Sequence, residues 1–414
     1  MSQHISKTSY LLYALLAFPL AFAGLPIYVH APDFYATEMG LSLSALGIVL
    51  LVLRLIDAAQ DPFLGSLSDA LSAHRKLVLC ISAFMLSLGF TMLFNPIGSS
   101  LIWFAASVFI CTTGFSLVTI NFHTLGGLWD VSKDQRTVVS ATREGFTLIG
   151  LLVASIIPNI LMASMDKKDA FSYLGYAYLP LVALCFVIFL KWWKGANFQK
   201  SSDDQSTNKI SFALMVKNKW NISFFGVYGL SNFASAIPAT LVIFFIRDKL
   251  DAEHLTGLFL LLYFLSGAAF MPLWQIISKK TGKIQAWRWS MIAACITFVW
   301  AFFLSEGDVT SYGIICVFSG AALGADLALP PAILADRIDE TSTQHGASKY
   351  YAALTFLTKF SFALATGFAL PVLSFMGFEP GQALTPEASV TMSVIYALIP
   401  CIFKAICIVF LAKK

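Results

Sequence analysis

Long apolar stretches alternate with short polar ones along the whole chain. Each stretch is long enough to cross a bilayer as a helix, which takes about 20 apolar residues. The stretches lie at about residues 9–30, 43–70, 77–95, 101–125, 138–163 and 172–191, and then at 215–246, 255–278, 285–304, 311–335, 350–376 and 389–411. The pattern predicts an all-α membrane protein with about twelve transmembrane helices.

A hydrophilic stretch, with KSSDDQSTNK at its centre, divides these helices into two sets of six. Two sets of six helices joined by a polar linker are typical of secondary transporters built from two halves. We therefore expect an N-terminal six-helix bundle over residues 1–193, a cytoplasmic linker over 194–212 and a C-terminal six-helix bundle over 213–414.

Composition agrees with a membrane protein and argues against an enzyme. Of the 414 residues, 58% are hydrophobic and 12% charged, whereas about 25% are charged in a soluble domain. The seven cysteines form no CxxC pair or metal-ligand spacing, so we interpret them as core residues. HExxH, nucleophile-elbow and glycine-rich phosphate-loop motifs are missing. We expect no enzymatic activity, no cofactor and no nucleic-acid partner, and a monomer in the lipid bilayer.

The positively charged residues predict the orientation, because cytoplasmic loops are enriched in Lys and Arg. With the N-terminus inside, most loop positives fall on the inner side: Arg75, Lys76, Lys133, Arg136, Lys279, Lys280, Lys283, Arg337, Lys349, Lys413 and Lys414, besides the linker. We therefore expect both termini in the cytoplasm and the protein in the cell (inner) membrane.

The apolar run 43–70 contains an unusual group of charges. Arg54, Asp57 and Asp61 stand at i, i+3 and i+7, which places them on one face of a helix. A charge at the bilayer centre costs about 3 kcal/mol or more, so this face should line a protein-enclosed cavity. Two carboxylates one turn apart can close on one small cation, Na⁺ or H⁺. The alternative is a structural brace, in which Arg54 neutralises one aspartate.

Other polar residues within apolar runs are candidates for the same cavity. Asn121 and Thr124 offer neutral oxygens to the cation. Lys359 would pair with Asp57 or Asp61 when the ion is absent, or else snorkel to the membrane surface. The remaining candidates for substrate binding or coupling are Arg54, Asn121, His123, Arg143, Tyr228, Tyr263 and Asp326.

Several of these candidates have a structural alternative. Arg143 and Glu144 would form an ion pair at the end of their helix. Asp326 would make a hydrogen bond between helices, and His123 would be a satisfied polar contact. Most Trp and Tyr residues in membrane proteins anchor at the interface, but Tyr228 and Tyr263 lie deeper in their runs.

Two motifs of the first half resemble known transporter families. Gly65 to Asp69, followed by Arg75, is similar to the G-x-x-x-D-basic loop of the major facilitator superfamily. The pattern R-x-x-D-x-x-x-D-P that begins at Arg54 resembles helix 2 of the glycoside–pentoside–hexuronide cation symporters, the melibiose permease family. The resemblance implies that Asp57 and Asp61 bind Na⁺, Li⁺ or H⁺. It also implies that Asp69 and Arg75 act in gating.

Two later segments extend this resemblance over the chain. Asp134-Gln-Arg136 with Arg143 is similar to the family's D-K-R-E-R loop and its helix-5 arginine. Ala335-Asp-Arg-Ile-Asp339 followed by Lys359 resembles the family's A-D-x-x-D-Y segment and its helix-11 lysine. We accordingly assign Asp336 and Asp339 to the gate.

The resemblance implies the major facilitator fold and cation-coupled symport of a small organic solute by alternating access. However, two sugar-binding carboxylates of the family are missing, at positions near Phe18 and Pro19 and near Asn121 and His123. Two alternatives therefore stay open: an amphipathic or lipid-like solute, as in animal lysophospholipid symporters of the same branch, and a cation-independent facilitator or exporter.

Overall fold

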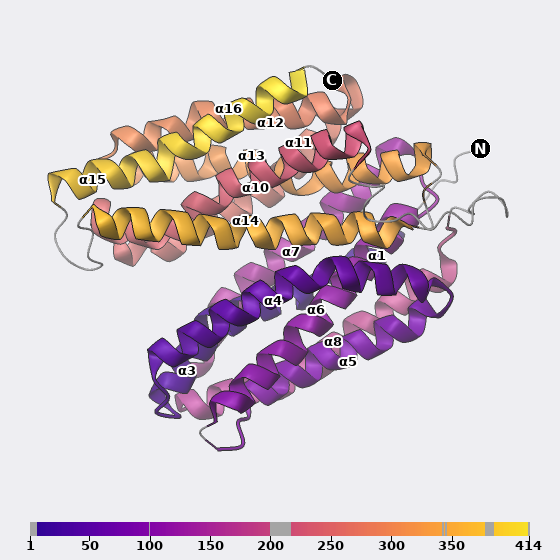
Figure 1. Ribbon diagram of the computed structural model, residues 1–414, viewed down its shortest axis with the longest axis horizontal. Helices are drawn as coiled ribbons and strands as arrows, with labels where there is room; N and C mark the ends of the chain where they lie inside the picture. The colour runs from indigo at the N-terminus through magenta and orange to yellow at the C-terminus, as the bar shows by residue number, and fades with distance from the viewer. Residues whose placement is uncertain are drawn as a thin grey trace. The chain divides into compact units, whose positions relative to one another are not determined.

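The computed structural model describes residues 6–98, 100–198, 217–341, 343, 346–376 and 385–412. These residues form helices and connecting loops, with an isolated β-bridge between Trp129 and Phe198 (Figure 1). The all-α prediction is confirmed. The chain forms two compact units: unit 1 is Met1–Ile210 with Leu334–Phe356, and unit 2 is Ser211–Ile333 with Leu357–Lys414.

Unit 1 begins with a helical stretch, Lys7–Thr37, that consists of four short helices, the third of which starts at Pro26. Its helices are α1 (Lys7–Ala14), α2 (Ala17–Leu25), η1 (Pro26–His30), α3 (Ala31–Thr37), α4 (Leu43–Ala70), η2 (Ser72–His74), α5 (Arg75–Phe94), α6 (Leu101–Leu128), α7 (Lys133–Met162) and α8 (Lys167–Gly195). The end of α13 and the start of α14 also belong to this unit, within Leu334–Phe356.

Unit 2 repeats the pattern of long helices with short connections. Its helices are α10 (Lys219–Phe244), η3 (Phe245–Lys249), η4 (Glu253–Leu255), α11 (Thr256–Thr281), α12 (Lys283–Phe298), η5 (Val299–Phe303), most of α13 (Val309–Glu340) and α14 (Ala347–Phe375), α15 (Pro386–Ser393), η7 (Val394–Leu398) and α16 (Ile399–Ala412). The predicted linker, 194–212, lies partly outside the described residues, so its boundaries stay a prediction.

The helix count matches the number of apolar runs. Among the described residues, 11 helical stretches are long and apolar enough to cross a membrane. The 28-residue helix α4 is not one of them, and it carries Arg54, Asp57, Asp61 and Asp69. With α4 included, every predicted run corresponds to a helix.

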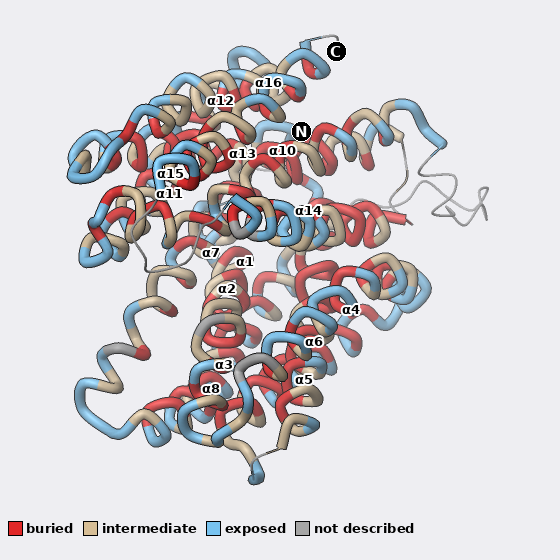
Figure 2. The backbone as a smooth tube through the Cα atoms, turned by 60° about the vertical axis from the view of Figure 1, so that its left-hand side comes forward, coloured by how far each residue is buried: buried red, intermediate tan, exposed pale blue. Residues whose placement is uncertain are grey.

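Large apolar side chains lie on both sides of these helices, inside the units and on their surfaces. Ile102 is 81% exposed and Phe63 76%, as expected for surfaces that face lipid. Buried and exposed residues alternate along the helices in Figure 2. Inside unit 1, buried tyrosines donate to backbone carbonyls of neighbouring helices: Tyr35 to Leu93 at 2.9 Å and Tyr178 to Pro19 at 2.8 Å. These bonds satisfy the hydroxyls in a core that offers few other partners.

Candidate functional site

Helix α4 places the predicted carboxylates inside unit 1. Asp57 is 5% exposed and Asp61 is fully buried. Arg54, by contrast, is exposed, and its guanidinium lies 4.3 Å from the centre of the Tyr28 ring in η1. A cation over an aromatic face is stabilised by the ring quadrupole. The predicted helix is therefore confirmed, and its two aspartates lie one turn apart on the buried side.

The Asp57 carboxylate has one hydrogen-bond donor on helix α6 and another on α4 itself. The Asp57 Oδ1 atom accepts from Ser116 Oγ at 3.0 Å and from Gln60 Nε2 at 3.0 Å. Gln60 Oε1 in turn accepts from Thr113 Oγ1 at 3.2 Å. Sequence reasoning did not single out Ser116, Gln60 or Thr113. The signal for Ser116 and Thr113 was the recurrence of hydroxyl residues in the run 101–125, at positions 112, 113, 116 and 119.

The two neutral ligands predicted on α6 make other contacts. The Asn121 side-chain oxygen accepts from Ser68 Oγ at 2.5 Å, and its amide donates to Leu117 O at 2.9 Å. Thr124 Oγ1 donates to Ile120 O at 2.6 Å. Their role as cation ligands stays a prediction. Within the described residues, Thr119 Oγ1, one turn after Ser116, is a buried oxygen without a hydrogen-bond partner.

Helix α7 carries the predicted ion pair between neighbouring residues. Arg143 Nη2 lies 2.7 Å from Glu144 Oε1, and its Nε lies 2.9 Å from the same oxygen. Arg143 is 2% exposed and Glu144 8%. The predicted pair is therefore present, and it is buried. His123 on α6 contributes an edge-on ring contact with Tyr351 at 6.1 Å.

The predicted gating residue Asp69 caps the first turn of α14 within unit 1. Its carboxylate accepts the backbone N–H of Ser348 at 3.0 Å and of Lys349 at 3.2 Å. Arg75 Nη2 lies 3.9 Å from the same carboxylate. A negative charge at a helix N-terminus satisfies free N–H groups and complements the helix dipole. Asp69 thus fastens the segment 334–356 to α4.

The other two predicted gating residues meet an arginine of α7. Arg136 lies 3.2 Å from Asp336 and 2.8 Å from Asp339, and it donates to Ala335 O at 3.2 Å. Arg136 is 3% exposed. All four gating candidates therefore take part in the contacts that hold the segment 334–356 within unit 1. They are Asp69, Arg75, Asp336 and Asp339.

The candidates of unit 2 lie on separate helices. The hydroxyl oxygen of Tyr228 in α10 lies 2.9 Å from Thr358 Oγ1 in α14. Lys359, also on α14, is partly buried. Asp326 of α13 makes the hydrogen bonds between helices that the structural alternative anticipated. Its partners are Lys404 Nζ of α16 at 2.5 Å and Trp287 Nε1 of α12 at 2.8 Å. Sequence reasoning missed Lys404, whose signal was a single lysine within the apolar run 389–411.

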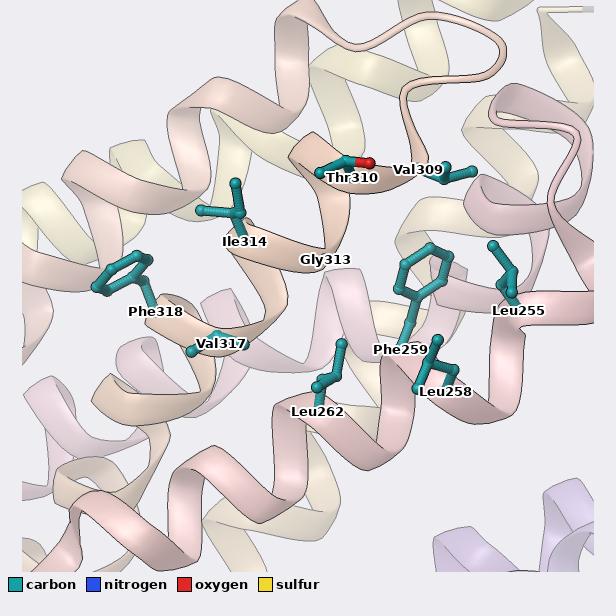
Figure 3. A pocket seen from close by; sticks show the side chains of 10 residues that line it. All are labelled: Leu255, Leu258, Phe259, Leu262, Val309, Thr310, Gly313, Ile314, Val317 and Phe318. Carbon is teal, nitrogen blue, oxygen red and sulfur yellow. The ribbon is translucent and has the colours of Figure 1, made fainter.

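An apolar groove of unit 2 is poorly suited to a polar solute. It has a volume of about 430 Å³ and lies between α11 and α13. Its side chains are apolar except for one oxygen, that of Thr310 (Figure 3). A polar solute needs several convergent hydrogen-bonding groups, so the polar clusters described above are the better candidates.

Helices long and apolar enough to cross a membrane, with carboxylates buried among them, are typical of a polytopic transporter. The MFS/sugar transport protein family matches residues 11–413, and the chain belongs to this family. It is therefore a multi-pass membrane transporter rather than an enzyme.

Relatives of the chain include several symporters. The uncharacterised symporter YnaJ of Bacillus subtilis is 25% identical over 394 residues, 89% of this chain and 82% of the relative. The putative glycoside/cation symporter YagG of Escherichia coli is 18% identical over 396 residues, 90% and 84% of the two chains. The sodium-dependent lysophosphatidylcholine symporter 1 of Gallus gallus is 27% identical over 147 residues, 34% of this chain and 28% of the relative. Cation-coupled secondary transport is thus the activity supported at family level.

Solved structures show the same fold. A bacterial homologue of the iron transporter ferroportin has a TM-score of 0.73 at 15% identity, covering 98% of this chain and 99% of that chain. The E. coli fucose:proton symporter FucP has a TM-score of 0.65 at 15% identity, covering 97% and 98%. The predicted major facilitator fold is confirmed.

Proposed function

We propose that the chain is a symporter that couples the entry of Na⁺ or H⁺ to the uptake of a small organic solute. One observation carries the proposal: Asp57 and Asp61 are buried one turn apart on a helix that is otherwise largely apolar. Buried carboxylates in a membrane helix are costly and usually mark an ion path. If they only braced the helices, the two carboxylates would add little stability, because apolar residues fill a helix bundle without the cost of removing charges from water.

Neutral oxygens around these carboxylates suit a small hard cation. Ser116 already lies within hydrogen-bond distance of Asp57, and Thr119 offers a buried oxygen on the same side of α6. We infer that Asp57 and Asp61 are ligands of the coupling cation. As neutral ligands, Ser116 and Thr119 are better candidates than Asn121 and Thr124. Na⁺ would take such oxygens as ligands, whereas H⁺ would bind a single carboxylate.

Release of the segment 334–356 is the proposed gating step. The segment is continuous with α13 and α14, and in unit 1 it is attached through Asp69 and Arg136. During alternating access these contacts would break and form again. Symport of this kind, in the cell membrane, is the activity we infer.

The test can be run before the solute is identified. Wild type and an Asp57→Asn/Asp61→Asn variant are unfolded thermally in choline, Na⁺ and Li⁺ salts over a range of pH. A ligand at about one hundred times its Kd stabilises by about 2.7 kcal/mol. The matched control is Asp33→Asn, which removes a carboxylate of unit 1 that pairs with Lys167.

We expect Na⁺ or Li⁺, or a fall in pH, to stabilise the wild type and Asp33→Asn but not the double variant. If the unfolding temperatures of all three proteins respond equally to every salt and pH, Asp57 and Asp61 have only a structural role and cation coupling is refuted. A lipid-like solute is the second candidate, favoured by the apolar composition of α2, AFPLAFAGL. Stabilisation by lysophosphatidylcholine under the coupling ion, with no effect of hydrophilic solutes, would select it.

A further inference from the structure

A small cavity lies entirely within unit 2, between α10, α11, α12, α13 and α16. Its volume is about 60 Å³. Its lining includes Asp326, Lys404, Tyr263, Ser235, Ser319 and Cys401, together with apolar residues of α10, α12, α13 and α16. A cavity needs about 10–15 Å³ to hold one water molecule. This one therefore has room for a few waters or for a hydroxyl group on a short carbon fragment.

An ion pair between α13 and α16 forms one wall of the cavity. Lys404 Nζ lies 2.5 Å from Asp326 Oδ2, with side-chain exposures of 9% and 16%. Lys404 also donates to Ser231 Oγ at 3.2 Å, and Asp326 Oδ1 accepts from the indole of Trp287 at 2.8 Å. Trp287 is 1% exposed. The pair is therefore fixed from α10 and α12 as well as by its own helices.

Stability alone does not account for this pair. Removing two charges from water costs several kcal/mol for each ion, and apolar residues of similar volume are often neutral or stabilising in such a place. Lys404 lies two turns before the end of α16, and Asp326 lies more than three turns before the end of α13. Neither charged group stands at a helix end, where water would solvate it at little cost.

The pair retains hydrogen-bonding capacity toward the cavity. An ammonium group has three N–H donors, and a carboxylate has about four lone-pair positions. The contacts described above occupy two donors of Lys404 and two positions of Asp326. A hydroxyl group is both donor and acceptor. It can donate to Asp326 and accept from Lys404 while the ion pair stays intact.

We propose that the cavity beside Asp326 and Lys404 is a subsite that binds an uncharged, hydroxyl-bearing part of the transported solute. The proposal rests on the transport function proposed above. Because the pair has no net charge, an ionic group would have to displace one partner, whereas a hydroxyl displaces neither. Tyr263 and Ser319 also line the cavity, and the Ser319 hydroxyl already donates to Ile315 O at 2.6 Å. Unit 2 would thus supply a carboxylate for the solute, which unit 1 lacks near Phe18 and Pro19 and near Asn121 and His123.

The experiment compares solute binding by four purified proteins in nanodiscs. They are wild type, an Asp326→Asn/Lys404→Met variant that removes both charges together, Tyr263→Phe, and a control. The control, Arg247→Met/Asp248→Asn, removes another ion pair of unit 2 whose residues do not line the cavity. The ligands tested are myo-inositol, galactose and xylose as uncharged polyols, with gluconate, glycine betaine and lysophosphatidylcholine for comparison.

We expect at least one uncharged polyol to bind wild type and the control, and the charge-removal variant to lose at least tenfold in affinity. Tyr263→Phe should lose roughly threefold to tenfold, the usual effect of one hydrogen bond. Wild-type binding by charged or lipid ligands alone would overturn the proposal. So would binding by no member of the panel, or an unchanged affinity in the charge-removal variant.

Two further readouts separate failure of the subsite from failure of the transport proposal or of folding. Stabilisation by the coupling cation in the charge-removal variant shows that this variant is folded and that the cation site is intact. In a variant whose only thiol is Cys401, a bound polyol should slow modification by methyl methanethiosulfonate. Polyol binding without any cation effect would refute coupling and keep the subsite. A cation effect with no slowing at Cys401 during polyol binding would refute the subsite and keep coupling.

Discussion

The attachment of α14 to α4 through Asp69 gives a prediction whose size follows from the structure. The Asp69 carboxylate accepts two backbone N–H groups, those of Ser348 and Lys349. Loss of a capping side chain costs about 1 kcal/mol, and loss of a negative charge at a helix N-terminus costs about 0.3–1 kcal/mol. Asp69→Ala should therefore weaken the first turn of α14 by about 2 kcal/mol. Asp69→Asn, which keeps an acceptor oxygen, should weaken it by about 1 kcal/mol.

Amide hydrogen exchange measures this effect at the site itself. Exchange of a protected amide reports the free energy of local opening. A loss of about 2 kcal/mol corresponds to roughly thirtyfold faster exchange, and about 1 kcal/mol to roughly fivefold. The peptide that contains Ser348 and Lys349 should show these increases by mass spectrometry. Arg75, 7% exposed and 3.9 Å from Asp69, would lose its carboxylate neighbour, which adds to the effect in the same direction.

A peptide from the start of α10 serves as the internal control. That helix is capped by its own Asn218, whose side chain accepts from Trp220 N at 2.9 Å. Its exchange should not change in either Asp69 variant. Unchanged exchange at Ser348 and Lys349 would refute the capping argument. Equal acceleration at both helix starts would show general destabilisation instead of a local cap.

Two other substitutions test how the segment 334–356 is held within unit 1. A Cβ added at Gly65 would lie 2.5 Å from Cβ of Ala352, whereas one at Gly47 on the same helix meets nothing within 4 Å. Gly65→Ala should therefore lower the thermal unfolding temperature. Gly47→Ala should stabilise the protein by about 0.5–1 kcal/mol and so raise that temperature slightly; the reverse order would refute the close approach. The ion pair between Lys133 and Glu340 has side-chain exposures of 61% and 46%, so a double-mutant cycle should give less than about 1 kcal/mol, and a larger coupling would contradict its solvent exposure.

The sequence predicted the helices well because membrane-spanning helices carry a strong local signal. A run of about 20 apolar residues is enough to identify each one. The face of α4 followed from spacing alone, since Arg54, Asp57 and Asp61 have helical periodicity. The Arg54 side chain is nevertheless exposed and lies over the Tyr28 ring. A long, flexible side chain can reach a different partner from its neighbours on the same helix face.

The sequence could not predict which side chains of neighbouring helices contact one another. The role of Asn121 and Thr124 as cation ligands stays a prediction from their chemistry, whereas the hydroxyl that the register of α6 against α4 places beside Asp57 is that of Ser116. Hydroxyl residues in membrane helices are ambiguous because they also bond to the carbonyl four residues earlier, as Thr124 does to Ile120. One sequence contains no signal for the register of one helix against another.

The strength of the attachment within unit 1 bears on whether transport can release it. The Asp69 cap contributes about 2 kcal/mol, and the exposed Lys133 pair less than about 1 kcal/mol. Arg136 adds at most about 3 kcal/mol, because Asp339, one of its two carboxylate partners, is 39% exposed at its side chain. A thousandfold difference in affinity between two states corresponds to about 4.1 kcal/mol. In the proposed transport cycle, an ion and a solute that each bound the released state about a thousandfold more tightly than the attached state would together outweigh an attachment of at most about 6 kcal/mol.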